Sequence, residues 1–266
     1  MDFASFIGIF FGTGMILLGL VLEEGSPSQL IGLSAAIIVL GGSSGAVILQ
    51  FPPKTLISAI LGLKSVFLGV KTNPAALIRQ IVDFARRARR EGILALEKEI
   101  PNVQDPFFSK ALTMAIDGLE PKTLYETMET EMSTIEDEWD KKSKVWEALG
   151  GYLPTVGIIG AVLGLIQVMQ KLQDINAVGV GIATAFVATI YGVGIANLIA
   201  LPIAGKLKAA GTELTRVKEM TLKGVLLIQE GINHSIIEEE LKSFLTEKAR
   251  AKYASKTSPA KEIKAE

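Results

Sequence analysis

Long apolar stretches alternate with polar ones along this chain of 266 residues. Four stretches contain no Asp, Glu, Lys or Arg: residues 3–22, 25–53, 148–170 and 175–205. Each is long enough to cross a hydrocarbon layer of ~30 Å, which takes roughly 20 helical residues. A soluble core of this size could hardly bury four such helices. We therefore predict an all-α integral membrane protein whose four transmembrane helices lie at about 3–22, 30–50, 152–171 and 178–204.

The remaining segments are polar and rich in helix-forming residues. They divide the chain into a first pair of membrane helices (1–50), a cytoplasmic helical domain (51–147), a second pair of membrane helices (148–205), a cytoplasmic helix that prolongs the fourth span (206–248) and a tail (249–266). Leucines and spaced lysines at 54–72 predict a helix along the membrane surface. The tail is rich in Lys, Ala and Ser, and we expect it to be disordered.

Basic residues predict the orientation, because cytoplasmic loops carry an excess of Lys and Arg. Only Lys171 lies in a short link between predicted helices. The basic residues near the other helix ends are Lys54, Lys64, Lys141, Lys142, Lys144, Lys206, Lys208, Arg216, Lys218 and Lys223. We therefore expect both termini and the 51–147 segment to lie in the cytoplasm, with the short links facing outward.

A charged band marks the first helix of the predicted cytoplasmic domain. This helix is expected at 74–96, with Asn73 as its N-cap and Pro74 at its first position. Basic residues come first in the band and acidic residues later: Arg86, Arg87, Arg89, Arg90, Glu91, Glu97 and Glu99.

Two interpretations of the band remain open. If the helix continues through Gly92, Arg90 and Glu97 share one face because they are seven residues apart. The band is then either a solvated face with ordinary pairs such as Arg87–Glu91, or a contact surface for a charged partner.

Composition excludes several kinds of site. The chain has no cysteine, which excludes disulfides and thiolate metal sites, and its single histidine argues against a histidine-based metal site or catalytic triad. It has no phosphate-binding glycine loop followed by Lys and Ser or Thr, so ATP is not expected to drive it. We expect no enzyme activity, no cofactor, no metal and no nucleic-acid partner.

The predicted spans lack the group that a proton carrier needs. Apart from Lys171 at the end of the third, their only ionisable side chains are Tyr152 and Tyr191, whereas proton pumps place a carboxylate or histidine within the bilayer. The chain alone therefore cannot form a complete proton-transfer device, although it could wall one whose titrating group comes from a partner.

Small residues line one face of the third and fourth predicted spans. They are Gly157, Gly160 and Gly164 in the third, and Thr184, Ala188, Gly192, Ala196, Ala200 and Ala204 in the fourth. Such faces let helix backbones approach closely, within one subunit or between subunits. Each of these spans also has one proline, Pro154 or Pro202, which forms a kink or hinge or else marks a helix end.

Four motifs together resemble the flagellar stator A subunit, the MotA/PomA family. Its second-helix signature is similar to residues 40–46 with Phe51 and Pro52, and its third-helix motif is similar to residues 154–166. Its fourth-helix motif is similar to residues 183–192 with Ala196, Asn197 and Pro202. Its cytoplasmic charged motif is similar to residues 89–97. The resemblance runs from about residue 5 to 246.

The resemblance implies a function and its partners. Five A subunits in the bacterial inner membrane would surround two B subunits of the MotB/PomB kind, each of which supplies an ion-binding aspartate. Ion flow would turn the ring, which exerts torque on the rotor protein FliG. Carried over residue by residue, Arg89, Arg90 and Glu97 would contact the rotor, and Pro154 and Pro202 would couple ion passage to motion.

The resemblance also bears on the coupling ion. Thr189 would lie beside the ion path, and Ala161 stands where sodium-driven members resemble one another in having threonine. Because sodium needs several oxygen ligands, we expect protons. The alternative function is a proton-driven ring like ExbB/TolQ that energises outer-membrane processes, although those proteins generally have three spans.

Overall fold

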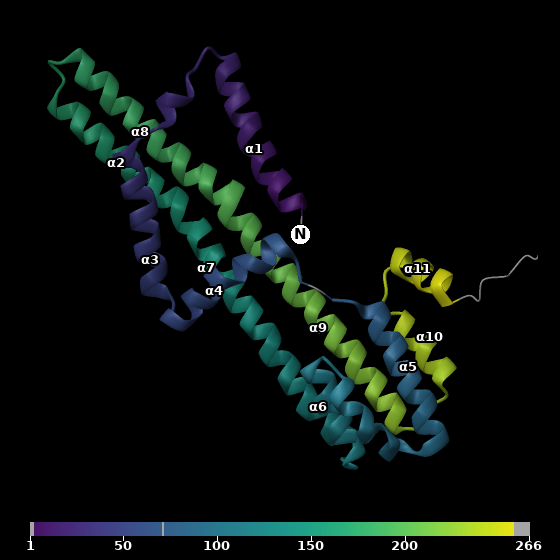
Figure 1. Ribbon diagram of the computed structural model, residues 1–266. Helices are drawn as coiled ribbons and strands as arrows, with labels where there is room; N and C mark the ends of the chain where they lie inside the picture. Colours follow the sequence, from purple (N-terminus) through teal and green to yellow (C-terminus); the bar gives the residue numbers. More distant parts are fainter. Residues whose placement is uncertain (1–2, 71, 258–266) are drawn as a thin grey trace, which may run out of the picture. The chain divides into compact units, whose positions relative to one another are not determined.

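The computed structural model describes residues 3–70 and 72–257, and within these residues the chain forms helices and no strand (Figure 1). The chain divides into two compact units. The first unit combines Met1–Val70 with Asp137–Gly211, and the second combines Lys71–Glu136 with Thr212–Glu266. Residues 51–70 and 137–147, which the sequence assigned to a cytoplasmic domain, thus pack with the membrane helices.

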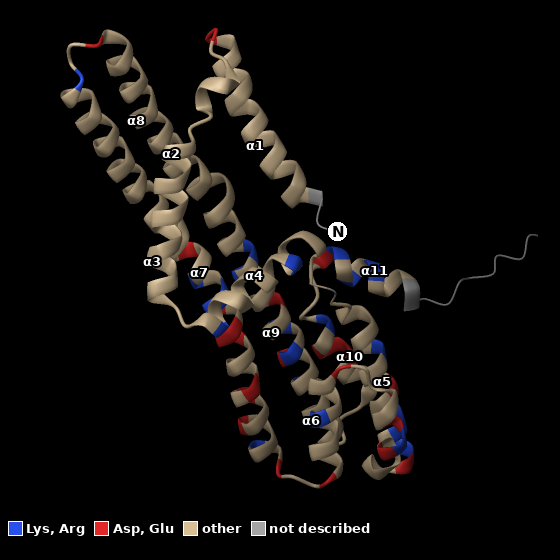
Figure 2. Cartoon of the chain, turned by 60° about the vertical axis from the view of Figure 1, so that its left-hand side comes forward, with Lys and Arg blue, Asp and Glu red and all other residues tan. Residues whose placement is uncertain are grey.

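Four long apolar helical segments of the first unit confirm the predicted fold class. They are α1 (Phe3–Leu22); the continuous run of α2 (Leu33–Ala36), η2 (Ile37–Gly41) and α3 (Gly42–Gln50); the end of α7 (Pro121–Gln170); and α8 (Ile175–Ile195) with η4 (Ala196–Ala200) and the start of α9 (Leu201–Gln229). Charged residues leave these spans almost clear and gather elsewhere along the chain (Figure 2). The segments η2 and η4 are short π-helices.

The second span begins at Leu33, a few residues later than the sequence predicted. The short 3-10 helix η1 (Pro27–Leu30) precedes it, and the chain is extended at Ile31 and Gly32. Tyr191 of α8 holds this break: its hydroxyl donates to the Leu30 carbonyl at 2.6 Å and accepts from the Gly32 N–H at 3.1 Å. The backbone groups freed by the break therefore find a partner, as they must inside a bilayer.

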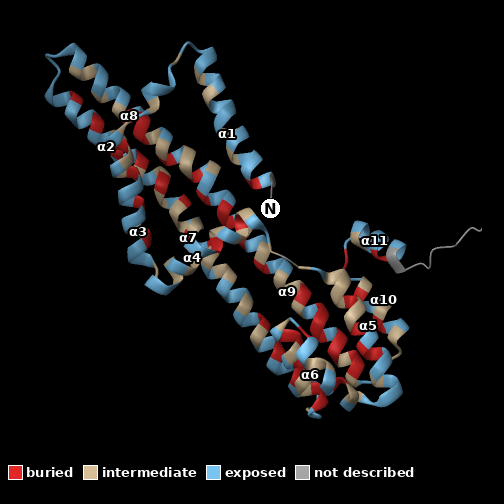
Figure 3. Ribbon diagram, in the orientation of Figure 1, coloured by how far each residue is buried: buried red, intermediate tan, exposed pale blue. Residues whose placement is uncertain are grey.

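The buried core of the first unit lies between the second, third and fourth spans. Ala35 and Val39 pack with Leu153, Ala196 and Ala200, all fully buried. By contrast, most of α1 is exposed within a single chain (Figure 3). Its apolar surface is therefore available to lipid or to other protein helices.

Helix α4 (Pro53–Leu68) has two apolar faces with different surroundings. Ala59 and Val66 are buried in the first unit, and the Trp146 indole N–H donates to the Ala59 carbonyl at 3.2 Å. Ile60 and Leu61, on the other side, are exposed. The predicted position along the membrane surface would turn this apolar outer face toward the lipid.

The second unit is a helical bundle with its own core. Its members are α5 (Pro74–Glu91), η3 (Ile93–Asn102), α6 (Pro106–Ile116), the start of α7, the end of α9, α10 (His234–Lys242) and α11 (Glu247–Thr257). Phe108, Leu112, Leu124 and Met220 are almost completely buried in that core. Lys218 bridges to Asp105 at 2.7 Å, and the Asp105 carboxylate also caps α6.

The C-terminal part differs from the sequence prediction in two ways. The helix that prolongs the fourth span ends at Gln229 instead of continuing to 248, because Gly231 turns the chain with φ 72°. The expected disordered tail is helical up to Thr257 in α11, which Tyr253 anchors with 2% of its surface exposed. Residues 258–266 lie outside the described residues.

Candidate functional site

The charged band lies where α5 ends and η3 begins. Asn73 caps α5 as predicted, since its side chain accepts from the Ala76 N–H at 3.1 Å. Gly92 ends the helix with φ 85° and ψ 159°, a conformation that is almost confined to glycine. Basic and acidic residues gather at this end of α5 (Figure 2).

The predicted single helix over 74–96 is therefore wrong beyond Glu91. The chain turns at Gly92 and continues as the 3-10 helix η3, so Arg90 and Glu97 do not share a helix face. The sequence alone could not show this break, because glycine is also tolerated inside helices at a cost of about 1 kcal/mol.

Some charges of the band are paired within the chain. Arg86 bridges to Asp83 at 3.4 Å, and Arg87 bridges to Glu99 of η3 rather than to Glu91 as the sequence suggested. The Arg87–Glu99 ion pair connects the two elements across the turn.

Arg89, Arg90 and Glu97 differ from these paired residues. All three are exposed, and no ion pair or side-chain hydrogen bond holds them within the described part of the chain. Exposed charges without local partners are free to meet a charged partner, and their long side chains lose no internal contact when they do so.

The third and fourth spans pack closely through their small residues. A methyl group added at Gly157 would lie 3.1 Å from the Ala188 carbonyl oxygen, and one at Gly164 would lie 3.0 Å from the Ala185 side chain. The glycine face of α7 therefore packs against α8 of the same chain. This pairing sets the register between α7 and α8.

Neither proline marks a helix end. Pro154 lies inside α7, which continues unbroken to Gln170, and Pro202 is the second residue of α9. The π-helix η4 directly precedes Pro202, and within it the Leu201 N–H donates to the Ala196 carbonyl five residues earlier. A proline removes one backbone N–H, and a π-helical turn is one way in which a helix adapts to a disturbed hydrogen-bond ladder.

Thr189 and Ala161 lie at one level of the helix pair. Gly157 and Gly160 of α7 both face Ala188, so residue 161 falls beside this level. Both residues are half-buried, and the Thr189 hydroxyl donates to the Ala185 carbonyl at 3.3 Å. Among the described residues, no cluster of carboxylates or histidines that could hold a metal ion occurs. The four predicted spans contain no Asp or Glu side chain.

Two features of the structure could not be predicted from the sequence. The π-helices η2 and η4 leave no clear signal in residue type. Beside η2, Ser43 is fully buried, and its hydroxyl has no hydrogen-bond partner among the described residues. The motif that contains it was noted, but its burial follows only from packing.

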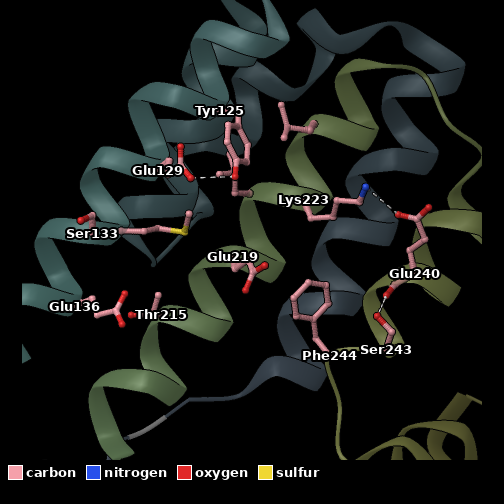
Figure 4. A pocket seen from close by; sticks show the side chains of 13 residues that line it. Tyr125, Glu129, Ser133, Glu136, Thr215, Glu219, Lys223, Glu240, Ser243 and Phe244 are labelled. Carbon is pink, nitrogen blue, oxygen red and sulfur yellow. Dashed lines mark hydrogen bonds and ion pairs between the residues drawn. The ribbon is translucent and has the colours of Figure 1, made fainter. Parts of the chain in front are cut away.

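The second such feature is a groove of about 720 Å³ in the second unit, between α7, α9 and α10 (Figure 4). Its polar lining includes Glu129, Glu136, Glu219 and Glu240. Lys223 bridges to Glu240 at 3.4 Å. Also in this lining, the Tyr125 hydroxyl donates to the Glu129 carboxylate at 3.2 Å.

Comparison with known proteins gives a consistent result. A sequence model of the MotA/TolQ/ExbB proton channel family matches residues 99–220. Motility protein A of Helicobacter pylori is 33% identical over 245 residues, which is 92% of this chain and 95% of that protein. The flagellar MotAB stator complex from Bacillus subtilis aligns with a TM-score of 0.88 at 33% identity, covering 95% of this chain and 100% of that one. The C. jejuni MotAB structure aligns with a TM-score of 0.89 at 32% identity, covering 93% and 97%.

Proposed function

The chain belongs to the MotA/TolQ/ExbB proton channel family as a MotA-type stator subunit of the flagellar motor, and from this premise we propose how its residues work. It is a multi-pass membrane protein and not an enzyme. The proposal is that it forms an ion channel with a B-type subunit and converts ion-motive force into torque on the rotor.

The B-type subunit supplies the aspartate that binds the ion. The spans of this chain contain no carboxylate, yet ion transfer through a bilayer needs a titratable group. The solved MotAB complexes to which the chain is similar contain such a second subunit. Several copies of the chain, five in the proposed ring, surround the B subunits in the bacterial inner membrane.

The passage is lined by the third and fourth spans. Thr189 and Ala161 lie at its middle, and Pro154 and Pro202 let the two helices bend as the ion binds and leaves. The disturbed hydrogen-bond ladder at η4 supports this role, because π-helical turns make a helix easier to deform.

The rotor contact is made by Arg89, Arg90 and Glu97 on the cytoplasmic side. The observation that carries this assignment is that these three charges are exposed and have no ion pair among the described residues, whereas the neighbouring Arg86 and Arg87 are bound within the chain. The partner is the rotor protein FliG, whose surface would present charges of opposite sign. Both termini of this chain then lie in the cytoplasm.

Charge reversal tests the rotor contact. Arg90→Glu should reduce torque at least about tenfold, since like charges in a contact cost several kcal/mol and slow the encounter of stator units with the rotor. Its level in the membrane should not change, because an exposed charge adds little to folding. The control is Lys122→Glu, which reverses an exposed lysine outside the band. Equal torque for the Arg90 variant and the natural chain would refute the assignment.

The alternative of a ring like ExbB/TolQ has no specific observation in its favour. This chain has four candidate spans and is similar to motility protein A over more than nine-tenths of its length.

A further inference from the structure

Leu94 is an unusual surface residue of the second unit. Its side chain is 68% exposed, more than any other large apolar side chain of that unit within the described residues. Single exposed leucines are common on protein surfaces, so exposure by itself assigns no role. The residues around Leu94 distinguish it from an ordinary exposed leucine.

The backbone around Leu94 is held firmly. Gly92 fixes the turn on one side, and Leu96, which is completely buried, fixes the other. The Arg87–Glu99 ion pair then ties η3 to α5. Leu94 therefore sits on a rigid element, which reduces the entropy lost when a partner covers it.

Unpaired charges flank this leucine along the chain. Arg89 and Arg90 precede it, Glu97 follows it, and none of the three has an ion pair within the described residues. An apolar side chain within a ring of polar groups is the usual composition of an interface hot spot: the centre gives affinity, and the rim excludes water and sets orientation.

We propose that Leu94 is the apolar anchor of the rotor contact. It inserts between apolar side chains of a rotor helix that carries acidic residues toward Arg89 and Arg90 and a basic residue toward Glu97. This inference rests on the proposed function. It adds to that function the residue that holds the rotor contact together, whereas the charges only steer the two partners toward each other.

The physical need for an anchor comes from the weakness of exposed charge pairs. Each such pair gains little in water and is screened by salt at cellular ionic strength. Charges at the rim of an interface mainly change how fast partners meet, whereas a desolvated central side chain determines how long they stay together. Residence time on the rotor is therefore the quantity that Leu94 should control.

The experiment compares residence times in cells whose only A subunit is this chain, together with its own B subunit. Single stator units joining or leaving the rotor appear as steps in the rotation speed of a tethered cell. Leu94→Ala should shorten the dwell time of each step about thirtyfold, the lower end of a hot-spot effect. Leu94→Met, which keeps an apolar side chain of similar volume, should restore it. Ile236→Ala is the control, because Ile236 of α10 is 54% exposed and lies outside the band.

The outcomes separate this inference from the proposed function. If Arg90→Glu reduces torque and Leu94→Ala leaves the dwell time unchanged, the rotor contact stands and Leu94 is not its anchor. If neither change has an effect, the band does not contact the rotor and both proposals fail. A fall in the membrane level of Leu94→Ala would show that the side chain supports folding instead, and would also overturn the inference.

Discussion

Gly92 is the residue that shapes the charged band. Its backbone angles are almost inaccessible to any residue with a Cβ atom, although a methyl group there would meet no other atom within 4 Å. The penalty of a substitution is thus conformational rather than steric. Either the strain is kept, or α5 extends and moves Arg90 and Glu97 relative to each other.

Gly92→Ala should therefore lower the free energy of unfolding by about 1–3 kcal/mol and reduce torque. Gly118→Ala is a matched control, since Gly118 also has a positive φ (79°) and open space but lies outside the band. Thermal unfolding of the purified chain and speed at high load measure the two effects. If both variants lose stability but neither loses torque, the turn at Gly92 does not position the charged band for the rotor.

Ala161 bears on the choice of ion. With alanine at this level of α7, Thr189 of α8 contributes the nearby side-chain oxygen, and its hydroxyl already donates to the Ala185 carbonyl. Sodium needs several oxygen ligands, whereas a proton needs a carboxylate and a path. Swimming speed at fixed pH should therefore not change when potassium replaces sodium. Speed that follows external sodium and survives a protonophore would exclude proton coupling.

Among the elements, α11 shows how a polar C-terminal segment can become ordered. Its sequence is rich in Lys, Ala and Ser, yet Tyr253 is buried. The cations of Arg79 and Lys242 lie 5.7 and 5.5 Å from the centre of its ring. Burial and the neighbouring Glu238 raise the pKa of Tyr253 to about 12, so its hydroxyl remains protonated at neutral pH.

Removing this anchor should release α11. Tyr253→Ala removes a buried aromatic side chain and two cation–π contacts, a loss of roughly 3–5 kcal/mol for large core truncations. Hydrogen exchange should show that α11 loses protection while α5 keeps it. Tyr125→Ala serves as control, because Tyr125 is 44% exposed. Unchanged protection of α11 would mean that other contacts hold it.

The membrane helices could be predicted from the sequence because their signal is the absence of charge over many residues. The N-cap at Asn73 and Pro74 was predictable for a similar reason, since both residue types have narrow positional preferences. The end of α5 was not, because glycine is compatible with both a continued helix and a turn. The pairing of Arg87 with Glu99 depends on that turn and could not be foreseen from spacing along a helix.

At the scale of the whole molecule, the distribution of Lys and Arg predicts that both termini lie in the cytoplasm. The chain has no cysteine, so a single introduced cysteine can show on which side of the membrane its position lies. Ser26→Cys should react with an impermeant thiol reagent added outside the cell, and Ser133→Cys should not. Both serines are exposed, so a difference reports the side of the membrane rather than burial. The opposite pattern would reverse the topology.

Rotation of the flagellar motor in cells that lack their own stator subunits tests the central claim most directly. Such cells should turn when they produce this chain together with its B subunit, and their speed should rise in discrete steps as units join the rotor. A protonophore should stop them. Cells that do not turn, although both subunits are present together in the membrane and the rotor is intact, would contradict the assignment of this chain as a torque-generating stator subunit.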